Sequence, residues 1–413
     1  MVIRCDHISF GEIDLLAWMR RQSHYPKFFW ANRDHSEVWA CAGSVLTLRP
    51  SPHCLLQNVY SKMHSILNSN PELFFFGGSA FDDRKKMPSH WKAFGTFYYF
   101  VPRYTLKKIS GKTTLTTFFH DDEQPREPSF DRVVPMQSEQ IPFLEESRPQ
   151  REEWNQLVAH VLKDIDNHRY HKLVLARESR FWLPQSLCPE EMLNIFERPS
   201  NSHDFYFQLD TSTVFMGRSP ELLFRRTNRD LYSEAVAGSY AIDGDESELT
   251  QQSRTFLDDS KSQKEHAYVM NCLLHGFKHL CSQVSEPSRV TTMPQNGLLH
   301  LHSSLRGRLR PTVCDEQILN SLHPTPAVGG YPKEVTRKVL ARLEPFKRGW
   351  YAGTIGRISL ETTELAVGIR SMLARKKSIY IYAGAGIISQ SDAEMEWREL
   401  CQKTQPFRSR WNA

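Results

Sequence analysis

The chain has 413 residues, 40% of them hydrophobic and 24% charged, which is enough to bury a large core in one domain or several. Its 52 Lys and Arg against 47 Asp and Glu give a net charge of +5, too small a bias to indicate a nucleic-acid-binding protein. No run of about 18 apolar residues is present, and the amino terminus lacks the apolar core of a secretion signal, so we expect neither membrane spanning nor export. The eight cysteines are scattered without a Cys-x-x-Cys pair, so we expect reduced thiols in a cytoplasmic protein.

Residues 1–120 contain short aromatic and β-branched runs interrupted by Gly, Pro and charged residues, such as FFWANRDHSEVWACAG and FGTFYYFVPRY. This pattern predicts strands of an antiparallel sheet. Residues 121–153 are rich in charge and Pro, which predicts a connector to a C-terminal portion, residues 154–413. We expect both portions to belong to one large domain.

The C-terminal portion mixes helical and strand patterns. A helix is predicted from near Gln150, because apolar residues from Trp154 to Ile165 recur at helical spacing. Strand-like segments follow, then a helix from about Lys261 to Leu280, then SLRGRLRP and SIYIYAGAGIIS, and a final helix. Groups of strands followed by helices favour an α+β fold over alternating βαβ units.

Lys172 opens an apolar strand, KLVLAR, in which alternation turns Lys172 and Val174 to one face. A lysine at the end of a strand commonly extends to solvent. The sharper interpretation is a desolvated amine with a lowered pKa, which can act as a base near neutral pH.

Glu221 follows Ser219 and Pro220 at a turn between two apolar strands, in FMGRSPELLF. An ordinary turn glutamate is the simpler interpretation of this position alone. A carboxyl bordered by apolar residues can also stay protonated and serve as an acid. Together with Lys172 on a neighbouring strand, it would complete an acid/base pair.

Glutamates on two predicted helices could bind a cation. Glu265 lies at the edge of the buried stripe of its helix, and Glu396 and Glu399 share a face of the last helix, where Ser391 and Glu394 have the spacing of a capping box. Each helix alone would be read as carrying solvated carboxylates. Taken together, they offer the oxygen ligands that Mg²⁺ prefers, and no Cys/His set with the spacing of a zinc site is present.

Two further segments have features of an anion site. Arg370 lies in another apolar strand, ELAVGIRSM, and its planar guanidinium suits a carboxylate. The run from Tyr382 to Gly386, YAGAG, follows a strand and allows close approach to backbone amides. It is not GxGxxG and has no ribose-binding acid about 20 residues later, which excludes a dinucleotide site.

In combination, these segments resemble the chorismate-utilising enzyme family, and within it the isochorismate synthases. The resemblance rests on KLVLAR, FMGRSPELLF, EAVAGS, SQKEHAYV, LLHLHSSLRGRL, LHPTPAVGGYP, RGWYAGTIG, ELAVGIRS, YAGAGI and SDAEMEWREL, which occur in one order between residues 172 and 400. WMRRQSHYPKFFWANRD and FFFGGSAFDD extend it toward the amino terminus and are similar to the menaquinone-type members. The resemblance implies a single α+β domain of two stacked, mainly antiparallel sheets flanked by helices.

The resemblance also implies roles for individual residues. Lys172 would activate the water that attacks ring carbon 2 of chorismate, and Glu221 would protonate the hydroxyl that leaves carbon 4. Glu265 and Glu399, with Glu396 nearby, would hold Mg²⁺ against the ring carboxylate. The substrate-binding residues would be Gly238, Ser239, Arg370, Tyr382, Gly384, Gly386 and Lys403.

Two positions distinguish the reaction from those of relatives. Aminodeoxychorismate synthases carry a nucleophilic lysine in a PIKGT-like motif, where this chain has AVAGS with Ala237 in that place. Anthranilate synthases generally have glutamine where Lys172 stands, so Lys172 indicates that water, and not ammonia, is the nucleophile. No glutaminase subunit is then required.

Salicylate synthases share that lysine and remain an alternative, although HPTPAVGG at His323–Gly330 is more similar to enzymes that stop at isochorismate. Departures from the family pattern are Ser303 in place of threonine and the absence of an arginine after AGS. A non-catalytic basic binding protein is the alternative from another class. We expect a monomer or weak homodimer that uses Mg²⁺, binds chorismate and isochorismate, and acts in menaquinone or siderophore biosynthesis.

Overall fold

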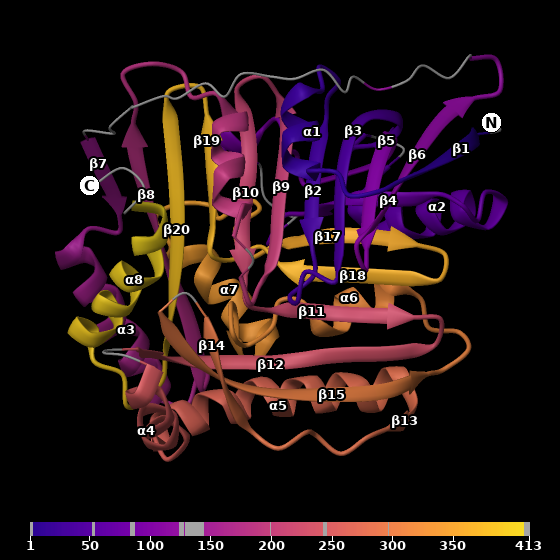
Figure 1. Cartoon of the computed structure of the whole chain (residues 1–413). Helices are drawn as coiled ribbons and strands as arrows, with labels where there is room; N and C mark the ends of the chain where they lie inside the picture. The colour runs from indigo at the N-terminus through magenta and orange to yellow at the C-terminus, as the bar shows by residue number, and fades with distance from the viewer. Residues whose placement is uncertain are drawn as a thin grey trace. The chain divides into compact units, whose positions relative to one another are not determined.

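Figure 1 shows the computed structural model of the chain, which describes residues 3–51, 54–82, 87–123, 128, 144–198, 200–242, 246–295 and 297–408. The chain forms two compact units that interleave along the sequence. The first comprises Met1–Phe143, Phe181–Ser219 and Gly349–Tyr380, and the second comprises Leu144–Arg180, Pro220–Arg348 and Ile381–Ala413. The predicted N-terminal sheet portion therefore lies within the first unit, which also takes in two later segments. That both units form one domain stays a prediction.

The first unit is built on antiparallel strands. Pairing runs β19–β10–β9–β2–β3–β5–β6–β1, and the first half of β5 also pairs with β4, which leads on to β17 and β18. The strands are β1 (Ile3–Phe10), β2 (Lys27–Ala31), β3 (Glu37–Leu48), β4 (Phe74–Ser79), β5 (Phe97–Ile109), β6 (Lys112–His120), β9 (His203–Asp210), β10 (Thr213–Ser219), β17 (Thr354–Ser359), β18 (Thr362–Val367) and β19 (Ser371–Arg375). The helices are α1 (Leu15–Arg21) and α2 (Leu56–Ser69), with short 3₁₀ turns at Ser89–Trp91 and Pro189–Phe196.

Aromatic side chains fill the interior of the first unit. The ring of Phe207 lies 5.1 Å from that of Phe28, 5.3 Å from that of Tyr98 and 5.9 Å from that of Trp350, measured between centroids. All four residues are at least nine-tenths buried. The aromatic runs that indicated strands in the sequence therefore also supply the core of this unit.

The second unit carries most of the predicted site residues. Strand β12 lies between β11 and β15, while β15 also pairs with β13 and β14, and β8 pairs with β16 and β20. Its strands are β7 (Leu144–Arg148), β8 (Lys172–Trp182), β11 (Leu222–Thr227), β12 (Asp230–Ala241), β13 (Cys281–Val284), β14 (Thr291–Gln295), β15 (Leu298–Leu309), β16 (Gly330–Tyr331) and β20 (Ser378–Ile387). Its helices are α3 (Arg151–Asp166), α4 (Glu246–Leu257), α5 (Ser260–Leu280), α6 (Asp315–Leu322), α7 (Lys333–Leu343) and α8 (Ala393–Arg408).

Helix α5 lies along β12 and β15 (Figure 1). It begins where the Asp259 side chain accepts a hydrogen bond from the Ser262 amide at 2.8 Å, which satisfies a free amide of the first turn. Val269, Leu273 and Leu280 are buried on the face that packs on the sheet. This packing fixes the direction of the helix and hence the position of Glu265 on it.

Helix α8 packs beside α3 (Figure 1). The indole of Trp154 donates to the Ala393 carbonyl at 3.0 Å, and its ring lies 6.1 Å from that of Trp397. The predicted capping box at the start of α8 is wrong. The Met395 amide instead donates to the Asp392 side chain at 3.0 Å, while the Ser391 hydroxyl accepts from the Ile388 amide at 3.1 Å.

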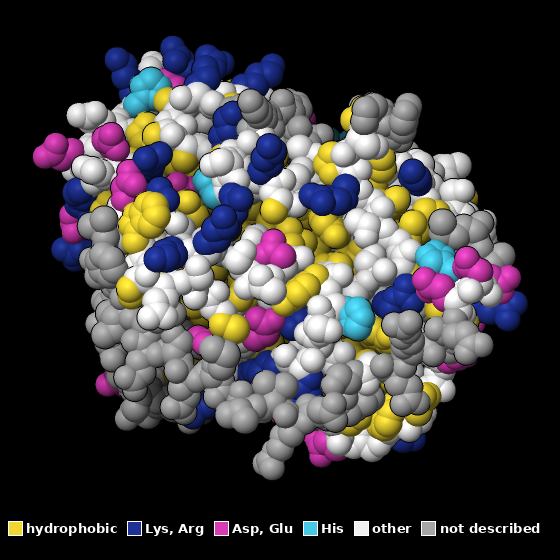
Figure 2. All heavy atoms as spheres, turned by 90° about the horizontal axis from the view of Figure 1, so that it is seen from above, with side chains coloured by type: hydrophobic (Ala, Val, Ile, Leu, Met, Phe, Trp, Pro, Cys, Tyr) yellow, Lys and Arg dark blue, Asp and Glu magenta, His cyan; other side chains and the backbone are white. Residues whose placement is uncertain are grey.

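The α+β fold class predicted from the sequence is confirmed, with the strands paired antiparallel. The predicted connector, residues 121–153, falls largely outside the described residues, and its last part forms β7 and the start of α3. No helix among the described residues is both long enough and apolar enough to cross a membrane. All eight cysteines are free, and Figure 2 shows Lys and Arg side chains dispersed among acidic and apolar ones on the face seen from above.

Candidate active site

Lys172 and Glu265 meet inside the second unit. Lys172 is fully buried at the start of β8, and its Nζ lies 2.9 Å from Oε1 of Glu265 on α5. The contact is not aligned as a hydrogen bond, and among the described residues this ammonium has no hydrogen-bond acceptor. A Cβ on Gly386 of β20 would lie 2.5 Å from Glu265 Oε1 and 3.0 Å from Lys172 Cε, so only glycine leaves room for the pair. A buried ammonium with unused donors can bind a polar ligand, and it can act as a base only after it has lost a proton.

Glu221 is the second buried ionisable group of this region. It lies between β10 and β11, is only 2% exposed, and its Oε1 accepts a hydrogen bond from the Thr325 hydroxyl at 2.7 Å. Burial raises the pKa of Glu221 to about 7, while the Thr325 hydrogen bond and the charge of Lys172 lower it and the charge of Glu234 raises it further. Glu221 can therefore carry a proton at neutral pH, and the charge of Lys172 acts on it directly.

The other predicted carboxylates interact with Lys261, a lysine that was not predicted to belong to the site. Lys261 Nζ lies 2.6 Å from Oε1 of Glu396, which is 1% exposed. Burial lowers the pKa of Lys261, but Glu396, Glu399 and Glu265 together outweigh burial and raise it. All three glutamates therefore face one cationic centre.

Glu396 and Glu399 influence each other on α8. Burial, and then the charge of Glu399, raises the pKa of Glu396 to about 7. Burial also disfavours the ionised form of Glu399, but Lys403 at 2.5 Å, together with Lys261 and a hydrogen bond from Ser239, lowers its pKa to about 2. At neutral pH Glu399 is therefore ionised, and Glu396 is partly protonated.

A bulge in β12 brings Ser239 to this cluster. Ala237 lies opposite Leu301 and Tyr240 opposite Leu299, so Gly238 and Ser239 together face His300 on β15. Gly238 has a φ of 75°, and its carbonyl lies 2.8 Å from His300 Nδ1. The bulge requires a left-handed residue here, which explains the glycine of the AVAGS motif.

The carboxylates suit a hard divalent cation. Mg²⁺ usually retains water and takes one or two protein carboxylates together with substrate oxygens, so a closed cage of three glutamates is not needed. Burial and then the charge of Glu399 raise the pKa of Glu396, and a bound cation would offset the repulsion between these two carboxylates. The oxygen donors at Glu265, Glu396 and Glu399 are of the kind that such an ion prefers, but each is here paired with a lysine, and the three ligand atoms do not all lie within 4.8 Å of one another.

The predicted substrate-binding residues lie in different surroundings. The Gly384 carbonyl accepts from Lys403 at 2.9 Å, which places this glycine beside Glu399. Tyr382 is buried, and its hydroxyl donates to Glu178 Oε2 at 3.0 Å. Arg370 belongs to the first unit, and the prediction that it lies in a strand is wrong. It has a φ of 49° in the turn between β18 and β19, and its carbonyl accepts from the Arg218 amide.

Three residues beside the predicted ones, Lys261, Thr325 and Glu234, were not predicted from the sequence. Lys261 stands four residues before Glu265, a spacing that puts both on one helix face and could have indicated it. Thr325 lies in the HPTPAVGG block, and no local signal connects it to Glu221, which is 104 residues away. Glu234 is buried on β12 and accepts a hydrogen bond from Tyr232 at 2.8 Å.

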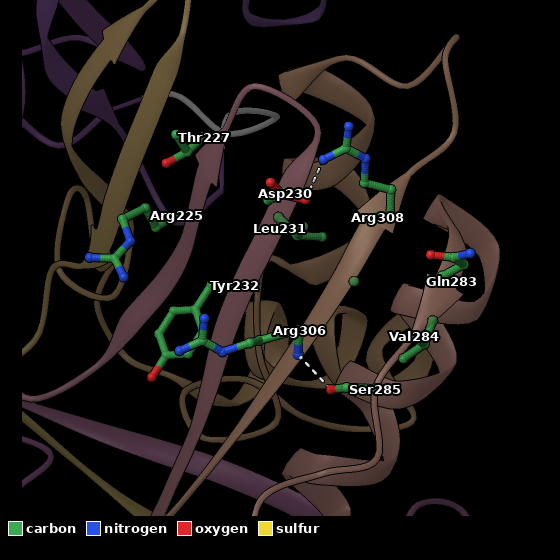
Figure 3. A pocket seen from close by; sticks show the side chains of 11 residues that line it. Arg225, Thr227, Asp230, Leu231, Tyr232, Gln283, Val284, Ser285, Arg306 and Arg308 are labelled. Atoms are coloured by element: carbon green, nitrogen blue, oxygen red, sulfur yellow. Dashed lines mark hydrogen bonds and ion pairs between the residues drawn. The ribbon is translucent and has the colours of Figure 1, made fainter.

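A cavity of about 620 Å³ lies at the other end of β12 (Figure 3). Arg225 and Arg306 are held 5.3 and 5.1 Å from the ring of Tyr232, and Arg308 pairs with Asp230 at 2.7 Å. None of the predicted acid, base or metal-binding residues lines it. With a rise of about 3.3 Å per residue, six residues along β12 separate Tyr232 from Gly238 by roughly 20 Å.

Comparisons with known proteins identify the family of the chain. The family model described as "Chorismate binding enzyme" matches residues 5–410. The isochorismate synthases MenF of Haemophilus influenzae and Escherichia coli are each 29% identical to the chain, over 96% of it and over 89% and 90% of their own lengths.

Solved structures give the same result for the fold. The menaquinone-specific isochorismate synthase MenF from Escherichia coli superposes with a TM-score of 0.85 at 27% identity, over 99% of this chain and 95% of that chain. Anthranilate synthase component I from Streptococcus pneumoniae, at 17% identity and a TM-score of 0.73 over 90% and 92% of the two chains, shares the fold. The chain belongs to the chorismate-binding enzyme family and is a chorismate-utilising enzyme related to the isochorismate synthases.

Proposed function

We propose that the protein is an isochorismate synthase, which converts chorismate reversibly to isochorismate. The observation that carries the proposal is that two buried ionisable groups interact: Lys172, fully buried at the start of β8, is close enough for its charge to act on Glu221, whose pKa is raised to about 7. A hydroxyl exchange needs one group that removes a proton from water and one that supplies a proton to the leaving hydroxyl. The isochorismate synthases among the relatives support the same reaction.

The reaction balances without any further reactant. Lys172, in its uncharged form, takes a proton from the water whose oxygen bonds to ring carbon 2 and becomes an ammonium, the ring double bonds shift, and the carbon 4 hydroxyl leaves as water with the proton of Glu221. One water enters and one leaves, so substrate and product are isomers. In the reverse direction the two residues exchange the roles of acid and base.

The substrate anions would be bound by backbone amides and polar side chains. Backbone amides at Gly238, Gly384 and Gly386 and the Ser239 hydroxyl would meet substrate oxygens, and Arg370 and Tyr382 would meet the enolpyruvyl carboxylate. When bound, Mg²⁺ would neutralise the ring carboxylate. Glu265 and Glu399 would hold it, with Glu396 and Lys403 adjusting the charge nearby.

The deciding experiment is a product assay. Purified protein with chorismate and Mg²⁺ should form isochorismate in the absence of ammonia and of a glutaminase subunit, and should return chorismate when isochorismate is supplied. Salicylate and pyruvate as main products would instead identify a salicylate synthase. No turnover under any of these conditions would identify a non-catalytic binding protein.

We also propose a role in menaquinone biosynthesis. The support is the similarity to MenF proteins over nearly the full chain, including the N-terminal segment. Restoration of menaquinone, and not of a siderophore, in a strain that lacks its own isochorismate synthases would test it. Cytoplasmic location and a monomeric or weakly dimeric state remain predictions that fractionation and sedimentation would check.

A further inference from the structure

A cysteine, a histidine and a glutamate meet at the surface of the first unit, outside the proposed active site. Cys5 and His7 are two residues apart on β1, so their side chains project from the same face of the strand. Glu72 lies in the turn between α2 and β4. Among the described residues, this is the one set of three or more Cys, His, Asp or Glu side chains whose ligand atoms all lie within 4.8 Å of one another.

Three distances define the geometry of the cluster. Cys5 Sγ lies 3.6 Å from His7 Nε2 and 3.5 Å from Glu72 Oε2, and His7 Nε2 lies 3.5 Å from the same Glu72 oxygen. The same three atoms thus form a nearly equilateral triangle. Each residue presents one ligand atom to the same point in space.

The triangle has the size of one face of a zinc coordination tetrahedron. With Zn–S of about 2.3 Å and Zn–N and Zn–O of about 2.0 to 2.1 Å, tetrahedral angles place the ligand atoms about 3.3 to 3.6 Å apart. Hydrogen bonds account for the two sulfur distances, since Cys5 Sγ donates to Glu72 and contacts His7 Nε2, but not for the third distance. The 3.5 Å between His7 and Glu72 exceeds the roughly 2.7 to 3.2 Å of an N–H···O bond.

The histidine is also oriented as a metal ligand. His7 Nδ1 lies 3.0 Å from the hydroxyl oxygen of Thr116, its partner on β6, so the imidazole presents Nε2 to Cys5 and Glu72. Metal-binding histidines usually make such a hydrogen bond through the second ring nitrogen, which fixes the ring orientation. A ring that only paired with a surface carboxylate would not need this support.

We propose that Cys5, His7 and Glu72 form a site for a borderline or soft divalent cation, with Zn²⁺ as the preferred ion and water in the fourth position. A cysteine ligand separates it from the all-oxygen carboxylates of the active site, because thiolates favour Zn²⁺ over Mg²⁺. The side chains of His7 and Glu72 are 51% and 68% exposed, so the ion is reached directly from solvent and can exchange. The bound ion would link β1 to the turn that contains Glu72, which is 67 residues from Cys5 in the sequence.

Cobalt binding to the full-length protein tests the site. Chelator-treated protein in excess Mg²⁺, which occupies the hard oxygen sites, is titrated with Co²⁺ while its absorption is recorded. We expect one equivalent to produce the intense visible bands of tetrahedral Co²⁺ together with a thiolate charge-transfer band in the near ultraviolet, and Zn²⁺ to displace it. Binding without a thiolate band would overturn the proposal.

Variants locate the site. Cys5→Ser should abolish the charge-transfer band, and Thr116→Val should weaken Co²⁺ binding by about tenfold or more while the band persists. Cys314→Ser is the control, because Cys314 is an exposed cysteine outside the cluster, and this variant should bind Co²⁺ as the wild type does. A band that survives in Cys5→Ser, or disappears in Cys314→Ser, contradicts the assignment. Added Zn²⁺ should raise the melting temperature of the wild type and not of Cys5→Ser, whose isochorismate formation should equal that of the wild type.

Discussion

The ammonium of Lys172 and the carboxylate of Glu265 lie 2.9 Å apart directly beneath the bare backbone of Gly386. Strand β8, helix α5 and strand β20 each supply one of these residues. Gly386 therefore determines how closely β20 can approach the Lys172–Glu265 ion pair.

Gly386→Ala should therefore disturb the Lys172–Glu265 pair. The added methyl would stand 2.5 Å from Glu265 Oε1, so the carboxylate must move, and we expect kcat/KM for isochorismate formation to fall by about tenfold or more, roughly 1.4 kcal/mol or more in transition-state binding. Gly11→Ala is the control, because nothing lies within 4 Å of a Cβ there. Equal kinetics for both variants would show that the close approach has no catalytic role.

Lys172→Ala should lower kcat by about 10² to 10⁴, the range expected for loss of a general base. Lys264→Ala, which removes an exposed lysine next to Glu265 in sequence, should retain wild-type turnover. Steady-state rates, with circular dichroism to verify folding, compare the two. A Lys172→Ala enzyme with wild-type kcat would end the proposed mechanism.

Glu221 should set the alkaline limit of activity. The acid is active when protonated, and its pKa is raised to about 7, so kcat should fall as the pH rises through about 7. Glu221→Gln should lower kcat by about 10² or more and remove this limb from the pH profile. A profile that keeps the limb after the substitution assigns it to another group.

Substitutions of two residues that act on Glu221 should shift the alkaline limb of the pH profile in opposite directions. Thr325→Val removes a hydrogen bond that lowers the pKa of Glu221, so the limb should shift upward by roughly one pH unit. Glu234→Gln removes a charge that raises this pKa, so the limb should shift downward. Shifts of the same sign would contradict the electrostatic account of the site.

The same group should make folding stability depend on pH. The pKa of Glu221 in the folded chain lies above its ordinary value of 4.5, so the folded state binds the proton more tightly than the unfolded chain does. The resulting stabilisation is fully present below pH 4.5 and is lost as the pH rises through about 7. Denaturant melts of the wild type and Glu221→Gln at pH 5 and 8 should show a smaller loss across this range for the variant.

Alanine substitutions at Gly238 and Gly111 distinguish the effect of backbone strain from the effect of steric crowding. Gly238 and Gly111 both have positive φ, 75° and 80°, so alanine at either should cost about 1 to 2 kcal/mol of folding free energy. A Cβ at Gly238 would also meet Ser262 Cβ at 3.1 Å, whereas nothing lies within 4 Å of one at Gly111. Only Gly238→Ala should therefore change KM for chorismate, measured at saturating Mg²⁺, and an equal change in Gly111→Ala would refute the assignment.

The metal hypothesis predicts a specific requirement for Glu399. Glu399→Gln should raise the Mg²⁺ concentration for half-maximal activity by about tenfold or more, because it removes an ionised oxygen ligand. Glu394→Gln is the control on the same helix, since Glu394 is exposed and pairs with Arg398 at 2.9 Å. An unchanged Mg²⁺ dependence in Glu399→Gln would exclude it as a ligand.

Local sequence patterns supplied several of the candidate site residues. An apolar strand that opens on Lys172 and a turn carboxyl at Glu221 are properties of short segments, and the α+β class follows from the order of such segments. Helical spacing also placed Glu265 toward the buried edge of α5. Local patterns failed at the ends of elements. The side chain that caps the start of α8 is Asp392 and not Ser391, and Arg370 lies in a turn and not in the expected strand.

The sequence by itself indicated most of the strands and helices and supplied the candidate site residues, because periodicity, side-chain type and short motifs are local properties. Only the tertiary structure decided which of those residues meet. Lys172 and Glu265 are 93 positions apart, and Thr325 and Glu221 are 104 apart, so their contacts exist only once strands and helices have packed. The same holds for Cys5 and Glu72, which no spacing rule connects, because burial and charge pairing act through space and not along the chain.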